Sequence, residues 1–235
     1  FYYCVYPMQQ GRKLRLKDPK KVVEEMIYFY DKLNVNNYIF RDPVFSIDKK
    51  HTILLCQEIL KSGIKFNIAV ETHLKNIDNE LADLFLKCGI KLIYVGIESA
   101  DEEVRKDAKR WSDENDAQLK KINYLEKIGI KIKTMYIIGF PEENEKKFLK
   151  TVDYALKVNS SYAQFSVFTP YPGTPVYKEY EKKIIVKRFE DFNQWKLVFK
   201  HNNFDAKSVR RLLDFAFKKY YLRFSWLKKM FINKI

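Results

Sequence analysis

The sequence lacks the features of several protein classes. Only 7 of its 235 residues are Gly and 7 are Pro, too few for a collagenous or linker-like chain. Mean hydropathy is −0.41, and no apolar run approaches the roughly 18 residues that a membrane-spanning helix needs, so we expect no transmembrane helix. No basic segment followed by an apolar one opens the chain, so no secretory signal peptide is expected. Because it begins with Phe1 rather than Met, we expect a fragment of a longer protein.

Cysteine is also scarce. An odd total of 3 in a chain of this size does not make a disulfide framework, which predicts a reducing, cytoplasmic compartment. Two of them, Cys56 and Cys88, fall among apolar residues of predicted helices, and we expect them in the core. The 3 histidines have no metal-binding spacing. Glycine-rich phosphate loops and the nucleophile elbow of hydrolases are absent from the sequence as well.

Positive charge is plentiful and uneven. The chain carries a net charge of +14, and residues 178–235 hold 16 basic against 6 acidic residues. Such a segment attracts phosphates, nucleic acid or an acidic membrane. The simpler interpretation, which we favour, is a lysine-rich solvated surface. We predict two domains, a core over 1–177 and a basic, aromatic-rich helical extension over 178–235.

One five-residue pattern recurs between helix-like and strand-like segments. It spans 61–65, 87–91 and 127–131, each time as Lys, a variable residue, Gly, Ile and Lys. Glycine suits the left-handed position just past a helix end, and lysine suits the negative end of the helix dipole. A repeated helix–glycine–strand junction predicts βα units and therefore a parallel sheet or barrel.

The expected elements alternate along the chain. Asp18, Asp48 and Asp78 can cap helices, the first over 19–33, and further helices are expected over 114–128 and 144–158. Short apolar runs that suit buried parallel strands cover 38–40, 66–70, 92–95, 132–138 and 163–168. No strand precedes the first long helix, so we expect a βα fold that lacks its opening strand.

Chemically useful residues follow each predicted strand. Because parallel βα folds bind ligands at the carboxyl ends of their strands, we examined those positions. They include Asp42, Glu71, Gly96, Glu98, Ser99 and Gly139, and the last strand ends in 169–175. Carboxylates suit an ammonium group or ribose hydroxyls, and glycines permit close approach to the backbone. Each residue alone is equally typical of a cap or turn, but together they favour a site.

Several of these segments resemble the radical S-adenosylmethionine (SAM) superfamily. They are Tyr3-Cys-Val-Tyr-Pro7, Phe40-Arg-Asp-Pro-Val-Phe45, Gly96-Ile-Glu-Ser99, Ile138-Gly-Phe-Pro141 with Glu143, and Tyr171-Pro-Gly-Thr-Pro-Val-Tyr177, in the family's order. The sequence is most similar to the cobalamin-binding branch, which contains anaerobic cyclases and radical methyltransferases. The segment 215–224 also resembles that branch's C-terminal helix, so the resemblance covers nearly the whole chain.

The resemblance implies an α/β fold, a partial (βα)6 TIM-like barrel here without its first strand. It also implies a 4Fe-4S cluster held by three cysteines, one of whose electrons cleaves SAM to a 5′-deoxyadenosyl radical. Methyl transfer or oxidative cyclisation of a lipid, tetrapyrrole or other small molecule would follow. An electron donor such as ferredoxin or flavodoxin would be needed, and cobalamin would be held by a separate N-terminal domain.

Individual roles follow from the same resemblance. Cys4 matches the third cluster cysteine, and Tyr3 matches the aromatic residue near the adenine. Asp42 matches the position that meets the methionyl amino group, and Glu98 and Ser99 match positions near the ribose and methionyl end. The remaining matches line or close the adenine pocket: Ile137, Gly139 and the segment from Tyr171 to Thr174.

Two positions depart from the family pattern. Phe1 stands where the second cluster cysteine should be, and Glu142 stands where the family often has Gly. Either the N-terminus is truncated or mis-spliced, or this copy has lost its cluster. We therefore expect the fragment to be inactive in isolation.

A non-enzymatic alternative is a cluster-free barrel that binds nucleic acid or a membrane surface. Residues 210–235 contain 8 Lys or Arg, 1 Asp and 7 aromatic residues, and such interleaving can bind single-stranded nucleic acid or an acidic membrane. We favour a helix that packs back on the core, because helical spacing relates Leu212, Leu213, Phe217, Tyr220 and Phe224.

Overall fold

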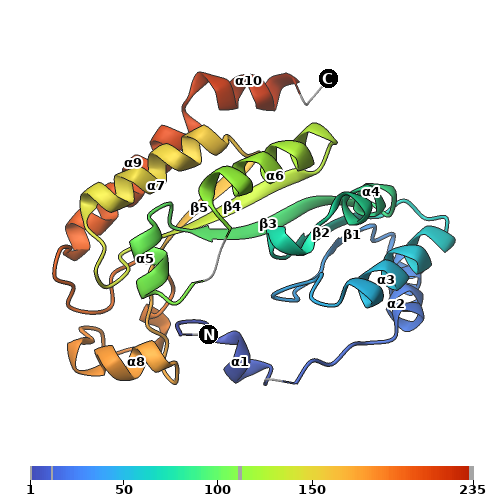
Figure 1. Cartoon of the computed structure of the whole chain (residues 1–235). Helices are drawn as coiled ribbons and strands as arrows, with labels where there is room; N and C mark the ends of the chain where they lie inside the picture. Colours follow the sequence, from blue (N-terminus) through green and yellow to red (C-terminus); the bar gives the residue numbers. More distant parts are fainter. Residues whose placement is uncertain (1, 12, 111–112, 233–235) are drawn as a thin grey trace. The chain divides into compact units, whose positions relative to one another are not determined.

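The computed structural model describes residues 2–11, 13–110 and 113–232, and it confirms the predicted α/β fold with a parallel sheet (Figure 1). The five strands lie in the sheet in the order in which they occur in the sequence. Their bounds are β1 Asn37–Ile39, β2 Asn67–Glu71, β3 Ile90–Glu98, β4 Lys131–Ile138 and β5 Tyr162–Val167. All five predicted strands are present.

The chain divides into two compact units. Unit 1 contains the described residues within 1–12, 97–115 and 134–235, and unit 2 those within 13–96 and 116–133. The helices mainly of unit 2 are α2 Pro19–Leu33, α3 Lys49–Lys61, η1 Leu74–Asn76, α4 Asn79–Lys87 and α6 Asn115–Lys127. Those of unit 1 are α1 Tyr6–Gln9, α5 Glu102–Asp107, α7 Glu145–Val158, α8 Pro175–Tyr180, η2 Glu181–Lys183, η3 Phe189–Asp191, α9 Ala206–Tyr221 and α10 Phe224–Ile232.

The predicted helix caps of unit 2 are confirmed. The carboxylates of Asp18, Asp48 and Asp78 each accept a hydrogen bond from the backbone N–H three residues later, at 2.9–3.1 Å. These bonds satisfy N–H groups that the first helical turn leaves without partners. The helices α2, α3 and α4 then pack in sequence, α2 on α3 and α3 on α4 (Figure 1).

The core of unit 2 includes both cysteines that we expected to be buried. Cys56 is 0% exposed and Cys88 is 3% exposed, and the Cys88 thiol donates a hydrogen bond to the Phe85 carbonyl. The hydrogen bond with Cys88 raises the pKa of the Cys56 thiol, and burial raises it further. Both are free thiols of the core, which is typical of structural rather than reactive cysteines.

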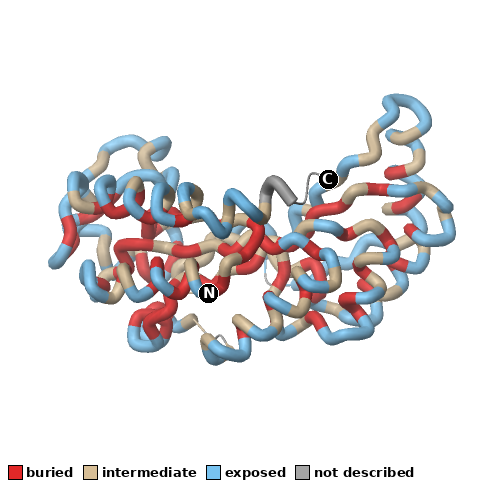
Figure 2. Tube along the Cα trace, turned by 90° about the horizontal axis from the view of Figure 1, so that it is seen from above, coloured by how far each residue is buried: buried red, intermediate tan, exposed pale blue. Residues whose placement is uncertain are grey.

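Unit 1 is organised around aromatic contacts on β5. The ring of Phe165 stacks on Tyr136 at 5.3 Å and meets Phe148 of α7 and Phe217 of α9 edge-on. The helices α7 and α9 lie side by side, and α9 packs on β5 (Figure 1). Along both helices buried and exposed residues alternate within each turn, as expected for helices with one apolar face. Figure 2 shows the same alternation of buried and exposed residues, red and pale blue, along the backbone of the molecule.

The C-terminal extension contributes to unit 1. Asp205 and Ser208 form a reciprocal capping box at the start of α9, and Leu212, Leu213 and Tyr220 are at most 3% exposed. The expectation that this part packs on the core is thus confirmed. It is wrong for Phe224, which is 80% exposed, because α9 ends at Tyr221 and α10 begins a new direction. The boundary at residue 177 stays a prediction.

In the part of the chain that the structure describes, every helix is too short or too polar to cross a lipid bilayer.

The predicted glycine junctions differ in how tightly they are packed. Gly63, Gly89 and Gly129 all have positive φ, as expected. A Cβ on Gly89 would lie 2.2 Å from the Phe66 carbonyl oxygen, whereas a Cβ on Gly63 would meet nothing within 4 Å. Gly89 therefore combines a left-handed backbone with close strand packing, and Gly63 has the backbone constraint alone.

We expect Gly89→Ala to lower the free energy of unfolding by roughly 2–4 kcal/mol. The new Cβ would force the Phe66 backbone to move, and alanine would also be strained in the left-handed conformation. Gly63→Ala is the matched control and should cost about 1 kcal/mol, the left-handed penalty alone. Urea denaturation of both variants measures the difference. Equal losses would show that the contact at Phe66 is not the constraint.

Candidate functional site at the strand ends

The segment that carries Cys4 is anchored beside the carboxyl end of β5. The Tyr2 carbonyl accepts a hydrogen bond from the Val176 N–H of α8 at 3.2 Å, and the Tyr2 hydroxyl donates to Glu179. Further along, Met8 of α1 lies so close to Gly173 that a Cβ there would be 2.1 Å from the Met8 Cε. These contacts hold the intervening residues, including the half-exposed Cys4, in one place.

Tyr3 packs into an aromatic cluster with residues that follow β4 and β5. Its ring centre lies 5.8 Å from that of Phe140 and 5.9 Å from that of Phe168, both edge-on. Burial raises the pKa of the Tyr3 hydroxyl, and the nearby charge of Glu98 raises it further. The predicted site residues Tyr3, Cys4 and Glu98 are therefore close together in unit 1.

Glu98 ends β3 in a strained conformation. Its φ of 67° lies in the left-handed region, which costs a non-glycine residue of order 1–3 kcal/mol and is often found at functional sites. Its carboxylate pairs with the Arg110 guanidinium at 3.6 Å, and the two side chains are only 15% and 17% exposed. A partly buried carboxylate is thus held at the end of a strand, as the sequence predicted.

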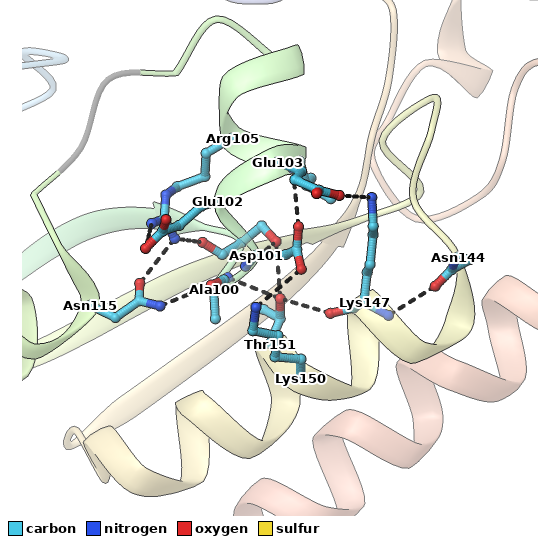
Figure 3. A network of polar contacts seen from close by, with 12 residues as sticks. Ala100, Asp101, Glu102, Glu103, Arg105, Asn115, Asn144, Lys147, Lys150 and Thr151 are labelled. Atoms are coloured by element: carbon cyan, nitrogen blue, oxygen red, sulfur yellow. Dashed lines mark hydrogen bonds and ion pairs between the residues drawn. The ribbon is translucent and has the colours of Figure 1, made fainter.

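A polar network fixes the loop that follows Glu98 (Figure 3). The Thr151 hydroxyl of α7 accepts from the Ala100 N–H at 3.0 Å and lies 3.1 Å from the Ser99 hydroxyl. The Asn115 amide donates to the Ala100 carbonyl at 2.9 Å, and its oxygen accepts from Arg105 at 2.9 Å. Thr151 thereby links the loop to α7. Asn115 links the loop and α5 to the start of α6.

Ion pairs surround this network. Lys150 pairs with Asp101 at 3.2 Å, and Lys147 pairs with Glu103 at 2.9 Å. Asp101 also caps α5 by accepting from the Val104 N–H, and these hydrogen bonds and charges hold its pKa below the usual value, although burial opposes them. Ser99 is 0% exposed, so its hydroxyl, which also accepts from the Asp101 N–H, faces the network.

The loop after β4 contains a buried carboxyl group. Gly139 has a φ of 85°, and its N–H donates to Oε2 of Glu143 at 2.7 Å. Glu143 is 0% exposed, and its Oε1 has no hydrogen-bond partner among the described residues. Burial raises the pKa of Glu143 to about 8, so the carboxyl group is mostly protonated at neutral pH.

The C-terminal extension supports this loop from outside. The Asn203 N–H donates to Nδ1 of His201 at 3.0 Å, so Nε2 carries the proton and donates to the Phe140 carbonyl at 2.8 Å. The Asn203 amide donates to the Glu143 carbonyl at 3.0 Å. Burial lowers the pKa of His201, which favours this neutral form. A cavity of about 90 Å³ adjoins the loop, lined by residues that include Tyr2, Asp107, Phe140, Glu143 and Tyr180.

The last strand end has its own turn. The Thr174 hydroxyl donates to the Tyr171 carbonyl at 2.6 Å and also accepts from the Tyr177 N–H, which caps α8. Tyr171 is half-buried, and burial raises the pKa of its hydroxyl. This turn lies next to α1 through Gly173 and Met8, and Tyr171 lies within it, after the carboxyl end of β5.

Unit 2 brings its own predicted residues to the ends of β1 and β2. The Phe45 N–H donates to the Glu71 carbonyl at 2.8 Å, which ties the loop of Asp42 to the end of β2. Asp42 is exposed and Glu71 is half-buried. Burial raises the pKa of Glu71, and the positive charge of Arg41 opposes that shift. Gly96 is half-buried near the end of β3.

The predicted residues of the central strands occupy the more open face of each strand. In β3 the alternate residues Ile93, Val95 and Ile97 are buried, while Gly96 and Glu98 are half-buried. In β4 Tyr136 and Ile138 are buried and Ile137 is half-buried. The period-two alternation of a strand therefore directs Gly96, Glu98 and Ile137 away from the fully buried side.

Four residues that the sequence does not predict support the site from a distance. Arg110, Thr151, His201 and Asn203 lie far along the chain from the loops that they contact. The sequence gives no motif for them. For His201, the only signal was the rarity of histidine in this chain, and that signal cannot identify a partner.

The donor set for a metal cluster is incomplete in the described residues. A group of three or more His, Cys, Asp or Glu side chains arranged to hold a metal does not occur among them. Cys4 is half-exposed, whereas Cys56 and Cys88 are in the core of unit 2. Phe1, at the position of the second expected cysteine, lies outside the described residues. A 4Fe-4S cluster bound by three thiolates therefore does not fit this chain alone.

The remaining arrangement offers a ligand one ring and one carboxylate. Phe140 and Phe168 are buried, whereas Tyr3 is half-buried, so Tyr3 is the ring of the cluster that a ligand could contact. The partly buried carboxylate of Glu98 can accept hydrogen bonds from hydroxyl or ammonium groups.

Comparison with known proteins places these observations in a family context. The sequence matches the Radical SAM superfamily over residues 2–155. It is 25% identical to an uncharacterized methyltransferase of Pyrococcus horikoshii, over 94% of this chain and 48% of that protein. It is 27% identical to the anaerobic magnesium-protoporphyrin IX monomethyl ester cyclase of Rubrivivax gelatinosus, over 95% of this chain and 39% of that one.

Solved structures agree on the fold. The radical SAM methyltransferase TsrM of Kitasatospora setae, with cobalamin and a [4Fe-4S] cluster bound, superposes with a TM-score of 0.69 at 19% identity, over 77% of this chain and 34% of that one. Coproporphyrinogen III oxidase of Escherichia coli gives a TM-score of 0.57 at 14% identity, over 89% of this chain and 48% of that one. This chain therefore spans at most about half the length of these relatives.

The buried carboxyl group gives a pH-dependent prediction. Because the pKa of Glu143 is raised from 4.5 to about 8 on folding, its contribution to stability is complete below about pH 4.5 and is lost as the pH rises to about 8. In Glu143→Gln the amide oxygen can still accept from Gly139 but cannot ionise. We expect its free energy of unfolding, relative to wild type, to rise by on the order of a few kcal/mol between pH 5 and pH 9.

Urea denaturation across that pH range measures the difference, with Glu142→Gln, the exposed neighbouring residue, as the matched control. The control should keep the wild-type pH dependence. A pH dependence in Glu143→Gln equal to that of wild type would contradict the assignment of a neutral buried carboxyl group.

Proposed function

This chain belongs to the Radical SAM superfamily, a family of enzymes, and on that premise we propose that it is the core of a methyltransferase or oxidative cyclase that binds SAM at its strand ends. The observation that carries the proposal is the anchoring of Tyr3 and Cys4 beside the ends of β4 and β5. Relatives named as methyltransferases and as a cyclase support both reaction types.

We assign the predicted residues to parts of SAM. In unit 1 the adenine would lie against Tyr3, Ile137, Gly139 and Tyr171, because an apolar strand and aromatic rings suit a purine. Glu98 would accept hydrogen bonds from the ribose or the methionyl end, with Ser99 fixing the loop behind it. In unit 2 the assigned residues are Asp42 for the methionyl amino group, with Glu71 and Gly96 at the neighbouring strand ends.

The cluster needs ligands beyond the described chain. Cys4 would supply one thiolate of the 4Fe-4S cluster that the family uses, and the other thiolates would come from residues that the described chain does not supply. Such a cluster, when bound, would supply the electron for cleavage of SAM. Cobalamin is bound in the neighbours TsrM and OxsB, and in this protein we assign it to a separate N-terminal domain.

The partners and location follow from the same proposal. The substrate would be a small molecule of lipid or tetrapyrrole type, since relatives act on magnesium-protoporphyrin and bacteriochlorophyllide compounds. A ferredoxin or flavodoxin would donate electrons, and the protein would act in the cytoplasm. The core would be residues 1–177 and the extension residues 178–235.

The single available thiolate favours one alternative, a barrel that has lost its cluster and serves as a binding module. The two functions differ in whether the protein binds iron and whether the bound iron requires Cys4. Anaerobic reconstitution of the whole protein that contains this chain distinguishes them.

We expect the reconstituted wild type to show visible iron–sulfur absorbance and to release 5′-deoxyadenosine from SAM. Cys4→Ala should lower both iron content and 5′-deoxyadenosine release at least about tenfold, because a cluster ligand is lost. Cys88→Ala, which removes a buried core thiol, is the control and should keep its iron.

Absence of iron from the reconstituted wild type would establish the cluster-free alternative. Equal iron in wild type and Cys4→Ala would show that Cys4 is not a cluster ligand. Circular dichroism would monitor folding in these variants. Loss of iron from a folded Cys88→Ala would show that Cys4 is not the only cysteine of this chain on which the cluster depends.

A further inference from the structure

Helix α10 presents its apolar and polar side chains in an unusual arrangement. Its inner face is held by polar bonds to the segment between α7 and β5: the Trp226 indole N–H donates to the Ser161 carbonyl at 2.9 Å, and Lys229 donates to the Asn159 carbonyl at 2.8 Å. Arg223, just before α10, donates to the Asn159 side chain at 2.6 Å. Polar groups thus fasten this helix to unit 1.

Apolar side chains point away from these bonds. Leu222 is 71% exposed, Phe224 is 80% exposed and Leu227 is 37% exposed. Together with the exposed Lys228 they form what we call the outer face of α10. A helix on a soluble domain normally buries such residues and exposes its cations, so the outer face of α10 has the opposite polarity.

The preceding helix shows that this exposure is local. In α9 the apolar residues Val209, Leu212, Leu213, Ala216 and Tyr220 are all buried, and α9 packs on β5 and α7. The same extension therefore buries one amphipathic helix completely before it exposes the apolar side chains of the next. Packing against unit 1 accounts for α9 but not for the outer face of α10.

The charge of this region is of one sign. From Phe215 to the end of the sequence there are six Lys or Arg residues and no Asp or Glu. Each cation near an anionic lipid surface strengthens binding, and the effect decays within a Debye length. Apolar side chains that enter the boundary between headgroups and acyl chains add the second contribution that interfacial helices need.

We propose that the outer face of α10 docks on the surface of an anionic lipid bilayer, with the helix lying parallel to the membrane. At 1.5 Å per residue its nine residues are far too short to span a bilayer, but they suffice to insert Phe224 and Leu227 at headgroup depth. Lys228, the exposed cation of that face, would contact lipid phosphates. This inference concerns the extension alone and does not rest on the proposed chemistry.

Two other occupants fit the outer face less well. A second copy of the chain would bring cations against cations, which disfavours association. Single-stranded nucleic acid is bound by rows of exposed rings on which successive bases stack, whereas the outer face offers one ring, Phe224, beside the aliphatic Leu222 and Leu227. An anionic membrane satisfies both the charge and the exposed aliphatic side chains.

Vesicle flotation with the whole protein tests the proposal. We expect the protein to float with vesicles of equal parts phosphatidylglycerol and phosphatidylcholine, and to bind pure phosphatidylcholine at least about tenfold more weakly. Raising the salt from about 50 to about 500 mM should reduce the bound fraction severalfold, because screening weakens the attraction of the cations to the lipid.

The discriminating variant is Phe224→Ser combined with Leu227→Ser. Both side chains are on the surface, so the fold should persist, and partition onto anionic vesicles should fall at least about tenfold because the inserted apolar area is lost. Phe189→Ser is the matched control, since Phe189 is also 80% exposed and lies in the same extension outside α10. It should bind like wild type.

Three results would overturn the proposal. One is failure of wild type to float with anionic vesicles at low salt. Another is an equal loss of vesicle binding in the α10 variant and in Phe189→Ser, or no loss in either. Binding would then be independent of the apolar side chains of α10. The third is a wild-type dimer by light scattering that Phe224→Ser converts to monomer, which would assign the outer face to a second copy.

Discussion

The site depends on the contact between the N-terminal segment and the turn that follows β5. The two segments touch at Gly173, where an added Cβ would lie 2.1 Å from the Met8 Cε and would displace that side chain. Nearer the N-terminus, the Tyr2 carbonyl accepts a hydrogen bond from the amino-terminal end of α8. The Tyr3 ring packs on Phe140 and Phe168, and Cys4 follows it in the chain. A residue far in sequence from any strand of unit 1 is thereby fixed beside two strand ends.

A buried, neutral carboxyl group gives the β4 loop its shape. An ionised carboxylate with one oxygen lacking a hydrogen-bond partner would be costly in this environment, and burial therefore raises the pKa of Glu143. The protonated group can still accept the Gly139 N–H, which holds the left-handed turn at that glycine. The loop is thus stabilised by a hydrogen bond whose acceptor stays uncharged near neutral pH. Its geometry is coupled to protonation, although Glu143 itself faces the protein interior.

Local signals predicted most of the fold, and non-local contacts explain what they did not predict. Helix caps such as Asp48 and left-handed glycines such as Gly89 depend on residues within one turn, so the sequence contains the information directly. The strand-end positions followed from the parallel arrangement, which places Glu98 and Gly139 without knowledge of side chains. Their supporting contacts, Arg110 on Glu98 and His201 on the Phe140 carbonyl beside Gly139, are chosen by packing between distant segments. Phe224 was misassigned for a related reason, since helical spacing continues through Leu222 while the backbone changes direction.

The extension is therefore more than a charged appendage. Through His201 and Asn203 it contacts the loop that carries Gly139 and Glu143, and through α9 it covers β5. A helix fastened to the same unit by Trp226 and Arg223 presents apolar side chains outward. Since both sets of contacts belong to one compact unit, a surface that binds α10 would hold the β4 and β5 strand ends at a fixed distance from itself. For a lipophilic substrate, that constraint would determine how far from the membrane the reaction takes place.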